Sequence, residues 1–288
     1  MTGRPRSVAL VGSERGLRVD PDLPIASRAL QEAGHRADLV RWDDPEVDWD
    51  AYDLSVVRSC WDYAWRLEEF LGWANTVPRL RNSSPVLKWN VEKTYLRDLS
   101  RLGLPVVPTV WNPSDVTQLP PANEWVVKPS ISAGSRDTAR WTDPADALRH
   151  VGELVAVGRT ALVQPYQPSV DRAGETAMLF LGGTFSHSVR KGPLLLRGEG
   201  VRQDRDSRGD LRPVQATAAQ REVAQAVLDA VPRLVSDAGP LLYARIDLVE
   251  GEDCLPRLLE LELAEPSLFL PQAPDAVGRL VEAILAEA

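Results

Sequence analysis

The stretch RLLELELAEPS, residues Arg257–Ser267, alternates like a β-strand but carries two acidic side chains, Glu260 and Glu262, only two residues apart. Alternate side chains of a strand lie on the same face, so both carboxylates are expected to point in one direction. The leucines between and beside them are expected to face a core: Leu259, Leu261 and Leu263. Like charges side by side destabilise a strand, which predicts that a cation lies between the two glutamates.

The preceding stretch, LLYARIDLVEG, predicts a second strand that places Arg245 and Asp247 on one face. A short acidic turn, EGEDC, joins the two stretches, so a hairpin would bring Asp247 close to Glu260 and Glu262. Three converging carboxylates are suited to Mg²⁺, which prefers oxygen ligands and keeps some of its water. The alternative is a sheet with one solvated acidic face. The carboxylate triad and its arginine, on two consecutive strands, favour the metal, and we expect two Mg²⁺ ions.

The composition of the chain is that of an ordinary globular protein, with 288 residues, 44% hydrophobic and 26% charged. A net charge of -8 argues against nucleic acid as a partner. The two cysteines, Cys60 and Cys254, have no metal-type spacing and suggest a reducing compartment. No apolar stretch is long enough to span a membrane, and the start of the chain indicates a strand rather than a signal peptide. We therefore expect a cytoplasmic protein with no membrane partner.

Three regions follow one another along the chain, with expected boundaries at 1–88, 89–167 and 168–288. The first has a β-α-β-β-α order, starting at the apolar run Ser7–Ser13, which is typical of a small parallel-sheet domain. A helix over Val91–Gly103, carrying Lys93, and a proline-bounded strand, LPVVPTVW, open the second. The rest consists of strands with short connections and a few helices.

One segment, from Leu194 to Val214, has no apolar periodicity and many arginines. A structureless loop of this length is unusual inside a compact domain unless it is a lid or disordered. We expect a lid that excludes water. Its arginines are Arg197, Arg202, Arg205, Arg208 and Arg212.

Several polar segments are candidates for binding an anionic ligand. In WVVKPSISAGSRDT, Lys128 ends a strand and a Ser/Gly turn follows, whose backbone N–H groups can cradle phosphate. A solvated lysine before an ordinary turn is the alternative reading. Lys93 is equally ambiguous by itself, and Arg190 and Lys191 add two cations at another strand end. The turn residues that would contact phosphate are Ser130, Ser132, Gly134 and Ser135.

Two further strand ends are candidate binding positions. Proline interrupts a strand at Gln164–Tyr166, in ALVQPYQP, and such an exposed edge can hydrogen-bond an adenine or be a plain exit from the strand. Arg58, Ser59 and Asp62 follow a predicted parallel strand, and α/β sheets bind ligands at such carboxyl ends. We assign these three residues, with Ser267, to a substrate site.

Taken in chain order, Lys93, VVKP, the Ser/Gly loop, VQPY, GE, ARIDLV and ELELAEPS resemble the ATP-grasp superfamily over nearly the whole chain. The resemblance implies an ATP-grasp fold, with an N-terminal parallel-sheet domain and a split nucleotide-binding region. It implies that Lys93 and Lys128 hold ATP phosphates, that Gln164, Pro165 and Tyr166 form the adenine hinge, and that Glu175 faces the ribose. Mg²⁺ would be held by Asp247, Glu260 and Glu262.

The metal strand departs from many ATP-grasp ligases, since it reads Glu-x-Glu where they read Glu-x-Asn. VVRSCWDY, FSHSVRKGP and ELELAEPSLFLP are similar to a subgroup of glutathione-synthetase-like ligases that includes the enzymes forming D-cycloserine from O-ureido-D-serine. The resemblance implies a carboxylate–amine ligase that works through an acyl phosphate. Lys191, Arg190 and Arg245 would then stabilise the reacting groups.

Three functional classes remain open on this reading. The chain is a ligase with an intramolecular or intermolecular amine, a phosphotransferase with another acceptor, or a non-catalytic ATP-binding module. The complete acidic triad counts against the last. We expect a small amino-acid-like substrate and a homo-oligomer, either a dimer or a tetramer.

Overall fold

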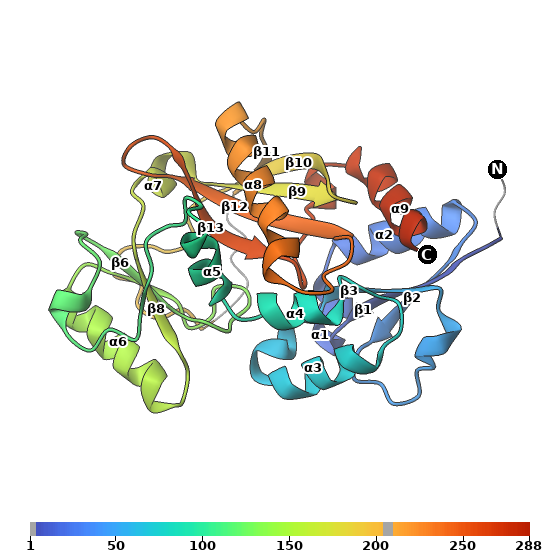
Figure 1. Cartoon of the computed structure of the whole chain (residues 1–288), viewed down its shortest axis with the longest axis horizontal. Helices are drawn as coiled ribbons and strands as arrows, with labels where there is room; N and C mark the ends of the chain where they lie inside the picture. Colours follow the sequence, from blue (N-terminus) through green and yellow to red (C-terminus); the bar gives the residue numbers. More distant parts are fainter. Residues whose placement is uncertain (1–3, 204–209) are drawn as a thin grey trace.

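The structure, a computed structural model, describes residues 4–203 and 210–288 of the chain. Within these residues, helices and three separate sheets make up the fold, which confirms the expected mixed α/β class. In Figure 1 the N-terminal parallel sheet and a small antiparallel sheet lie at opposite ends, and a large antiparallel sheet lies between them. Among the described residues, no helix is both long enough and apolar enough to cross a membrane.

The N-terminal sheet is parallel, with strand order β2-β1-β3-β4. Its two central strands are almost wholly buried, as expected of parallel strands that are covered on both faces. The strands are β1 (Ser7–Gly12), β2 (Arg36–Arg41), β3 (Leu54–Ser59) and β4 (Leu80–Arg81). The helices of this region are α1 (Glu14–Val19), α2 (Asp22–Glu32), α3 (Leu67–Thr76) and α4 (Ser84–Asn90).

The predicted helix over Val91–Gly103 is wrong in its first turn. Helix α4 ends at Asn90, helix α5 covers only Tyr95–Arg101, and Lys93 lies in the turn between them. The Lys93 backbone N–H donates to the Ser130 carbonyl at 2.8 Å, across to another segment, instead of to a carbonyl of its own helix. A tertiary hydrogen bond therefore overrides the local helical pattern.

The small sheet is antiparallel, with strand order β5-β8-β6-β7. Its strands are β5 (Val110–Trp111), β6 (Trp125–Pro129), β7 (Ala139–Trp141) and β8 (Ala161–Pro165), with helix α6 (Pro144–Ala156) packed on one face. The predicted strand LPVVPTVW shrinks to β5 and one isolated bridge at Val106, because Pro105 and Pro108 offer no N–H for a ladder.

The large sheet is antiparallel, with order β11-β10-β9-β12-β13. Its strands are β9 (Glu175–Leu181), β10 (Thr184–Lys191), β11 (Leu211–Pro213), β12 (Tyr243–Glu250) and β13 (Pro256–Glu262). Helices α5 and α8 (Ala218–Leu234) cover one face, and α9 (Ala276–Glu287) covers one end of the other with α2. The rest of that second face carries polar side chains, while the short helix α7 (Ser169–Ala173) packs beside β12.

The long segment from Leu194 to Val214 is not wholly irregular, which corrects part of its prediction. Strand β11, at its end, pairs antiparallel with β10. The earlier part is attached to the small sheet region, where the Arg202 N–H donates to the Thr138 carbonyl at 3.0 Å. Arg205 and Arg208 lie outside the described residues.

The opening hairpin forms as predicted, but its register contains a β-bulge. Asp247 pairs with Glu260 while Leu248 pairs with Leu258, so Leu259 is an extra residue in β13. The core therefore receives Leu258 in place of Leu259, and Leu259 borders a cavity. This corrects the prediction that Leu259 shares the core face of Leu261.

Candidate active site

Two paired strands place the acidic triad on one face of the large sheet. In the register of β12 and β13, Asp247 lies opposite Glu260 and Arg245 opposite Glu262. The carboxylate oxygens of the three acids lie within 4.8 Å of one another. Asp247 is fully buried, whereas the two glutamates border a cavity. The hairpin thus concentrates three negative charges at the floor of the cavity.

Two cations of the same sheet neutralise Asp247. Arg245 donates from Nε at 2.9 Å and from Nη2 at 3.0 Å, and Lys191 Nζ lies at 2.6 Å. Lys191 also contacts Glu175 at 2.7 Å. Burial by itself would raise the pKa of Asp247, but the charges of Arg245 and Lys191 hold that pKa below its usual range. Asp247 is therefore anionic at neutral pH.

A second pair of cations reaches Glu260 from the opposite wall. Lys128 Nζ, on β6, donates to the Glu260 carboxylate at 2.8 Å, and Lys93 Nζ lies 4.0 Å from it. Lys93 also donates to the carbonyl and hydroxyl of Ser132, each at 3.2 Å. Burial opposes ionisation of Glu260, yet the two lysines hold its pKa well below the ordinary value. Burial lowers the pKa of Lys93.

Glu262 occupies a different electrostatic environment from Glu260. Arg245 forms an ion pair with it, but burial raises the pKa of Glu262, and the charges of Asp247 and Glu260 add to that rise.

Side chains of the protein itself supply the positive charges that balance the acidic groups of the site. The four anions are Glu175, Asp247, Glu260 and Glu262, and the four cations are Lys93, Lys128, Lys191 and Arg245.

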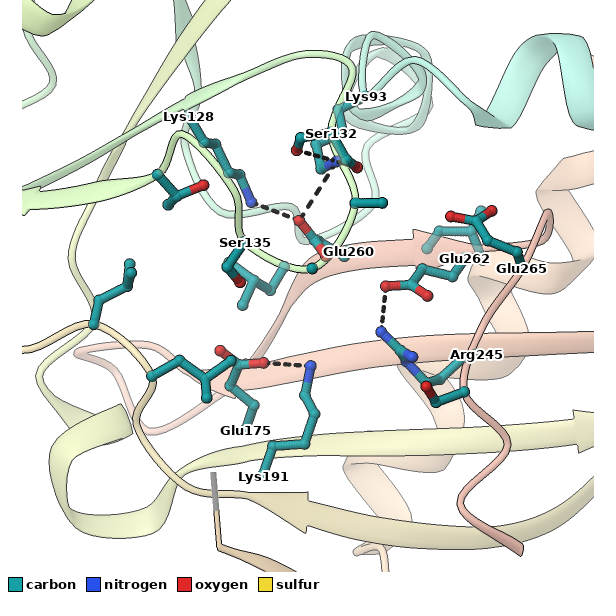
Figure 2. A pocket seen from close by; sticks show the side chains of 18 of the residues that line it. Lys93, Lys128, Ser132, Ser135, Glu175, Lys191, Arg245, Glu260, Glu262 and Glu265 are labelled. Carbon is teal, nitrogen blue, oxygen red and sulfur yellow. Dashed lines mark hydrogen bonds and ion pairs between the residues drawn. The ribbon is translucent and has the colours of Figure 1, made fainter. Parts of the chain in front are cut away.

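A cavity of about 600 Å³ lies between the large sheet, the small sheet and the N-terminal domain. Figure 2 shows how the charged side chains converge on it from the two sheets and the Lys93 turn. Most of the predicted site residues line this cavity. They are Lys93, Lys128, Ser132, Gly134, Ser135, Gln164, Pro165, Tyr166, Glu175, Lys191, Arg245, Glu260, Glu262 and Ser267.

The predicted hinge at Gln164–Tyr166 is fixed by bonds to neighbouring segments. Gln164 Nε2 donates to the Thr109 hydroxyl at 3.0 Å. The Tyr166 hydroxyl donates to Asp171 at 2.6 Å, and the Arg140 guanidinium stacks 3.4 Å from the centre of its ring. A wall whose side chains are already fixed suits a flat ligand, because little side-chain entropy is lost on binding.

The Ser/Gly loop between β6 and β7 bends over the cavity. Gly134 and Ser135 both have positive φ angles, 66° and 56°, as in a tight turn that exposes backbone groups. Arg136, the next residue, stacks its guanidinium 5.3 Å from the ring of Trp65 in the N-terminal domain. The loop therefore bridges two regions of the chain across the cavity.

Besides the fully buried Asp247, five predicted site residues do not line the cavity. Arg58 donates to the Pro266 carbonyl at 2.6 Å, and the Ser59 hydroxyl donates to Asp20 at 2.6 Å. The other contacts of this set are those of Asp62 with the Trp42 ring N–H, of Arg190 with the Arg172 carbonyl and of Ser130 with Glu92. Arg58 and Ser59 support the walls of the site from behind.

Several lining residues have no motif in the sequence that points to them. Asp22 accepts hydrogen bonds from the backbone N–H groups of Leu268, at 2.6 Å, and Leu270, at 2.8 Å. No local pattern could reveal a contact between positions 246 residues apart. Glu265 is different, because it belongs to the acidic stretch Arg257–Ser267 and could have been included by its charge. The added lining residues are Arg15, Asp22, Trp61, Tyr63, Glu265 and Phe269.

The acidic triad fits a hard divalent cation. All three residues offer carboxylate oxygens, and their mutual distances suit ligands shared by one ion or by two. Asp247 would bind the ion from the buried side of the site, and Glu260 and Glu262 would bind it from the side that faces the cavity. Lys128 and Arg245 now occupy part of this space, so metal binding would exchange these ion pairs for metal–oxygen bonds.

A large antiparallel sheet with paired carboxylates, facing the lysines of a second small sheet across a cavity, defines an ATP-grasp ligase. The fold is similar to that of the ATP-grasp ligase PsnB complexed with minimal precursor, Mg and ADP, with a TM-score of 0.64, 18% identity and coverage of 100% and 99% of the two chains. The fold is also similar to that of D-alanine–D-alanine ligase from Bacillus anthracis complexed with ATP. That comparison has a TM-score of 0.65 and 13% identity, and it covers 99% of this chain and 97% of the other. These two likenesses concern the fold alone.

A more specific relationship covers almost the entire chain. Residues 8–82 match the family model for the N-terminal domain of D-cycloserine synthetase DcsG. The cycloserine biosynthesis protein DcsG of Streptomyces lavendulae is 37% identical over 301 residues, covering 96% of this chain and 97% of that protein. The crystal structure of D-cycloserine synthetase DcsG has a TM-score of 0.88 at 36% identity, over 97% and 98% of the two chains. The chain belongs to the DcsG family.

Proposed function

We propose that this protein is an ATP-dependent carboxylate–amine ligase that closes O-ureido-D-serine into the ring of D-cycloserine. The family relationship to a cycloserine biosynthesis protein supports the substrate. The single observation that carries the chemistry is the acidic triad, within 4.8 Å, facing Lys93 and Lys128 across one cavity. A triad of this kind serves a reaction in which a phosphoryl group moves between two oxygen atoms.

The first step forms an acyl phosphate. An oxygen of the substrate carboxylate attacks the γ-phosphorus of ATP, the bond to the β-phosphate oxygen breaks, and ADP leaves. Lys128 and Lys93 turn from Glu260 to the phosphates, where their charges stabilise the moving phosphoryl group. Bound Mg²⁺, two ions held by Asp247, Glu260 and Glu262, would neutralise charge on the phosphate oxygens. Arg245, at the edge of the triad, orients the substrate carboxylate.

The second step forms the ring. The ureido nitrogen that is bonded to oxygen attacks the acyl carbon, the bond to phosphate oxygen breaks, and inorganic phosphate leaves with the proton of the nitrogen passing to solvent. The new ring still carries its carbamoyl group, and release of this group with one water, as carbon dioxide and ammonia, completes D-cycloserine. Holding both reacting atoms in one cavity favours closure, with effective molarities of about 10⁵ M or more.

Adenine is placed against Gln164, Pro165 and Tyr166, and the ribose beside Glu175. The Ser/Gly loop, with Ser132, Gly134 and Ser135, lies over the phosphates, and Lys191 keeps Asp247 in position. The described part of the Leu194–Val214 segment contributes Leu194, Leu195 and Arg202 to the cavity wall, where they would keep water from the acyl phosphate. We also propose a dimeric or tetrameric assembly.

A product analysis tests the proposal. Incubation of the protein with O-ureido-D-serine, Mg²⁺ and ATP should yield ADP, phosphate and D-cycloserine, with no added amine. Formation of pyrophosphate and AMP would exclude an acyl phosphate. An absolute need for a second amine would exclude ring closure and indicate an intermolecular ligase, and a stable phosphoester would indicate a phosphotransferase.

A further inference from the structure

Strand β13, which carries two of the three acidic residues, lies at the edge of the large sheet within residues 4–203 and 210–288, with β12 on one side. Alternate residues of such a strand turn their backbone groups toward the partner strand and away from it. Leu261 and Leu263, on either side of Glu262, turn theirs away from β12. Both leucines are buried, so these outward N–H and C=O groups need partners within the protein.

Three side chains satisfy these outward groups and take the place of a neighbouring strand. The Leu261 N–H donates to the Tyr95 hydroxyl at 3.0 Å, and Asn90 Nδ2 donates to the Leu261 carbonyl at 2.9 Å. The Leu263 N–H donates to Asn90 Oδ1 at 2.7 Å, and Asn82 Nδ2 donates to the Leu263 carbonyl at 2.7 Å. All four outward groups of the two leucines are therefore hydrogen-bonded.

Asn90 has the chemistry that its position requires. Its side-chain amide offers both a donor and an acceptor, as the peptide group of a neighbouring strand does. Its two bonds reach the residues before and after Glu262, so they fix the backbone on both sides of that carboxylate. Asn90 is itself buried, which keeps water from competing for these bonds.

The turn that carries Lys93 supplies two of these three side chains. Asn90 ends α4 and Tyr95 begins α5, so they lie on either side of the turn. The Lys93 backbone N–H bonds to the Ser130 carbonyl, and Lys93 Nζ lies 4.0 Å from Glu260, as can be followed in Figure 2. One short segment thus fixes the acidic strand relative to a lysine that we assign to the phosphates.

The acidic triad needs such support, because its charges repel one another. The carboxylate oxygens of Asp247, Glu260 and Glu262 lie within 4.8 Å of one another. Like charges at neighbouring positions of paired strands destabilise the pairing. Mg²⁺ also demands its oxygen ligands at about 2.1 Å, so a small shift of β13 would remove a ligand from the ion.

We propose that Asn90 and Tyr95 are positioning residues of the metal site, which hold the backbone of β13 so that Glu260 and Glu262 bind Mg²⁺ together with Asp247. The inference rests on the proposed function, because it takes the acidic triad as the Mg²⁺ ligands. Neither positioning residue supplies a ligand atom, and both act through the backbone. Loss of either one should therefore weaken metal binding although every ligand remains.

Binding of Mn²⁺, a paramagnetic substitute for Mg²⁺, tests the inference. The full chain is saturated with a non-hydrolysable ATP analogue, and electron paramagnetic resonance measures free Mn²⁺ during a titration. Asn90→Ala should bind Mn²⁺ about 10-fold more weakly than wild type, as expected when a group that orients metal ligands is lost. Tyr95→Phe loses a single hydrogen bond and should bind it about 3-fold more weakly. The affinity for ADP without metal should stay at the wild-type value in both.

Two control variants separate positioning from general stability. Glu262→Leu removes a ligand and should bind Mn²⁺ more weakly than Asn90→Ala does. Leu30→Ala opens a cavity in the core of the N-terminal domain, so it should lower the melting temperature and keep the wild-type Mn²⁺ affinity. If Leu30→Ala weakened Mn²⁺ binding as much as Asn90→Ala, lost stability would explain both effects and the inference would be wrong.

The remaining outcomes also decide. Wild-type Mn²⁺ affinity in folded Asn90→Ala would overturn the inference and leave the ligase standing. Tyr95→Phe keeps the aromatic ring and gives the same decision if Asn90→Ala does not fold. If Glu262→Leu binds Mn²⁺ as wild type does, the metal assignment within the proposed function fails, and the inference fails with it. If wild type binds Mn²⁺ as expected but forms no D-cycloserine, the proposed reaction fails and the positioning role stands.

Discussion

Replacing Glu260 by leucine should destabilise the metal-free protein, whereas replacing Glu262 by leucine should not. Both residues lie on β13, two positions apart and on the same face, but their partners differ. Glu260 is the counter-ion of Lys128, at 2.8 Å, and lies 4.0 Å from Lys93. Glu262 shares Arg245 with Asp247, and its pKa is raised because burial and two neighbouring carboxylates oppose its charge.

The magnitudes follow from what each substitution leaves behind. Glu260→Leu leaves two buried ammonium groups without their carboxylate and should lower the free energy of unfolding by about 3 kcal/mol. Glu262→Leu leaves Arg245 with both of its bonds to Asp247 and removes the repulsion. We expect its free energy of unfolding to stay equal or to rise by up to about 2 kcal/mol. For a chain of this size, each kcal/mol shifts the melting temperature by roughly 2–3 °C.

With ligand bound, Glu262→Leu should become less stable than wild type, the reverse of the order expected for the metal-free proteins. At a concentration 100 times its dissociation constant, Mg²⁺ with the ATP analogue should stabilise wild type by about 2.7 kcal/mol and Glu262→Leu much less. Glu262→Asn should keep part of the activity but need more Mg²⁺, having lost one ligand charge, and Glu260→Gln should be worse. The assays are thermal melts with and without ligand, and ADP release against Mg²⁺ concentration. Wild-type Mg²⁺ dependence in Glu262→Leu would refute the metal assignment, and equal destabilisation by both leucines would refute the electrostatic reasoning.

Three other predictions concern the walls of the cavity. Arg136→Ala removes the stacking on Trp65 that holds the Ser/Gly loop across the cavity. Water should then reach the acyl phosphate, so ADP should form several-fold in excess of cyclised product. An unchanged ratio of ADP to cyclised product would show that the loop closes without this stacking. His187 bonds to the Leu268 carbonyl through Nε2 at 2.8 Å, and burial lowers its pKa, so the folded protein binds fewer protons than the unfolded chain below about pH 6.5. Stability against urea should therefore fall as the pH drops through that range, and His187→Gln should weaken this dependence; an identical pH profile would contradict it. Proteolysis within 194–203 should slow when Mg²⁺, the ATP analogue and O-ureido-D-serine are added, and equal rates would argue against a lid.

Local sequence pattern determined most strands of the large sheet and the acidic character of the cavity floor that this sheet forms. Period-two alternation in RLLELELAEPS and LLYARIDLVEG was sufficient to predict a hairpin with Asp247, Glu260 and Glu262 on one face, because side-chain direction in a strand depends on position alone. Helix α8 is also a local feature, since the Thr217 side chain at its start accepts a hydrogen bond from the Gln220 N–H. These features depend on residues near one another in the chain.

Tertiary structure decided the features that depend on distant segments. The bulge at Leu259 and the turn at Lys93 each break a regular local pattern, the latter through the hydrogen bond to Ser130. The partner groups of the carboxylates also come from distant segments. Sequence placed the acids together and suggested a metal between them, but Lys128 reaches Glu260 from a strand 132 residues away. A charge acts through space rather than along the chain, so a buried charge acquires its partner only when the sheets pack together. That partner then sets the pKa of the group and the free-energy cost of burying it.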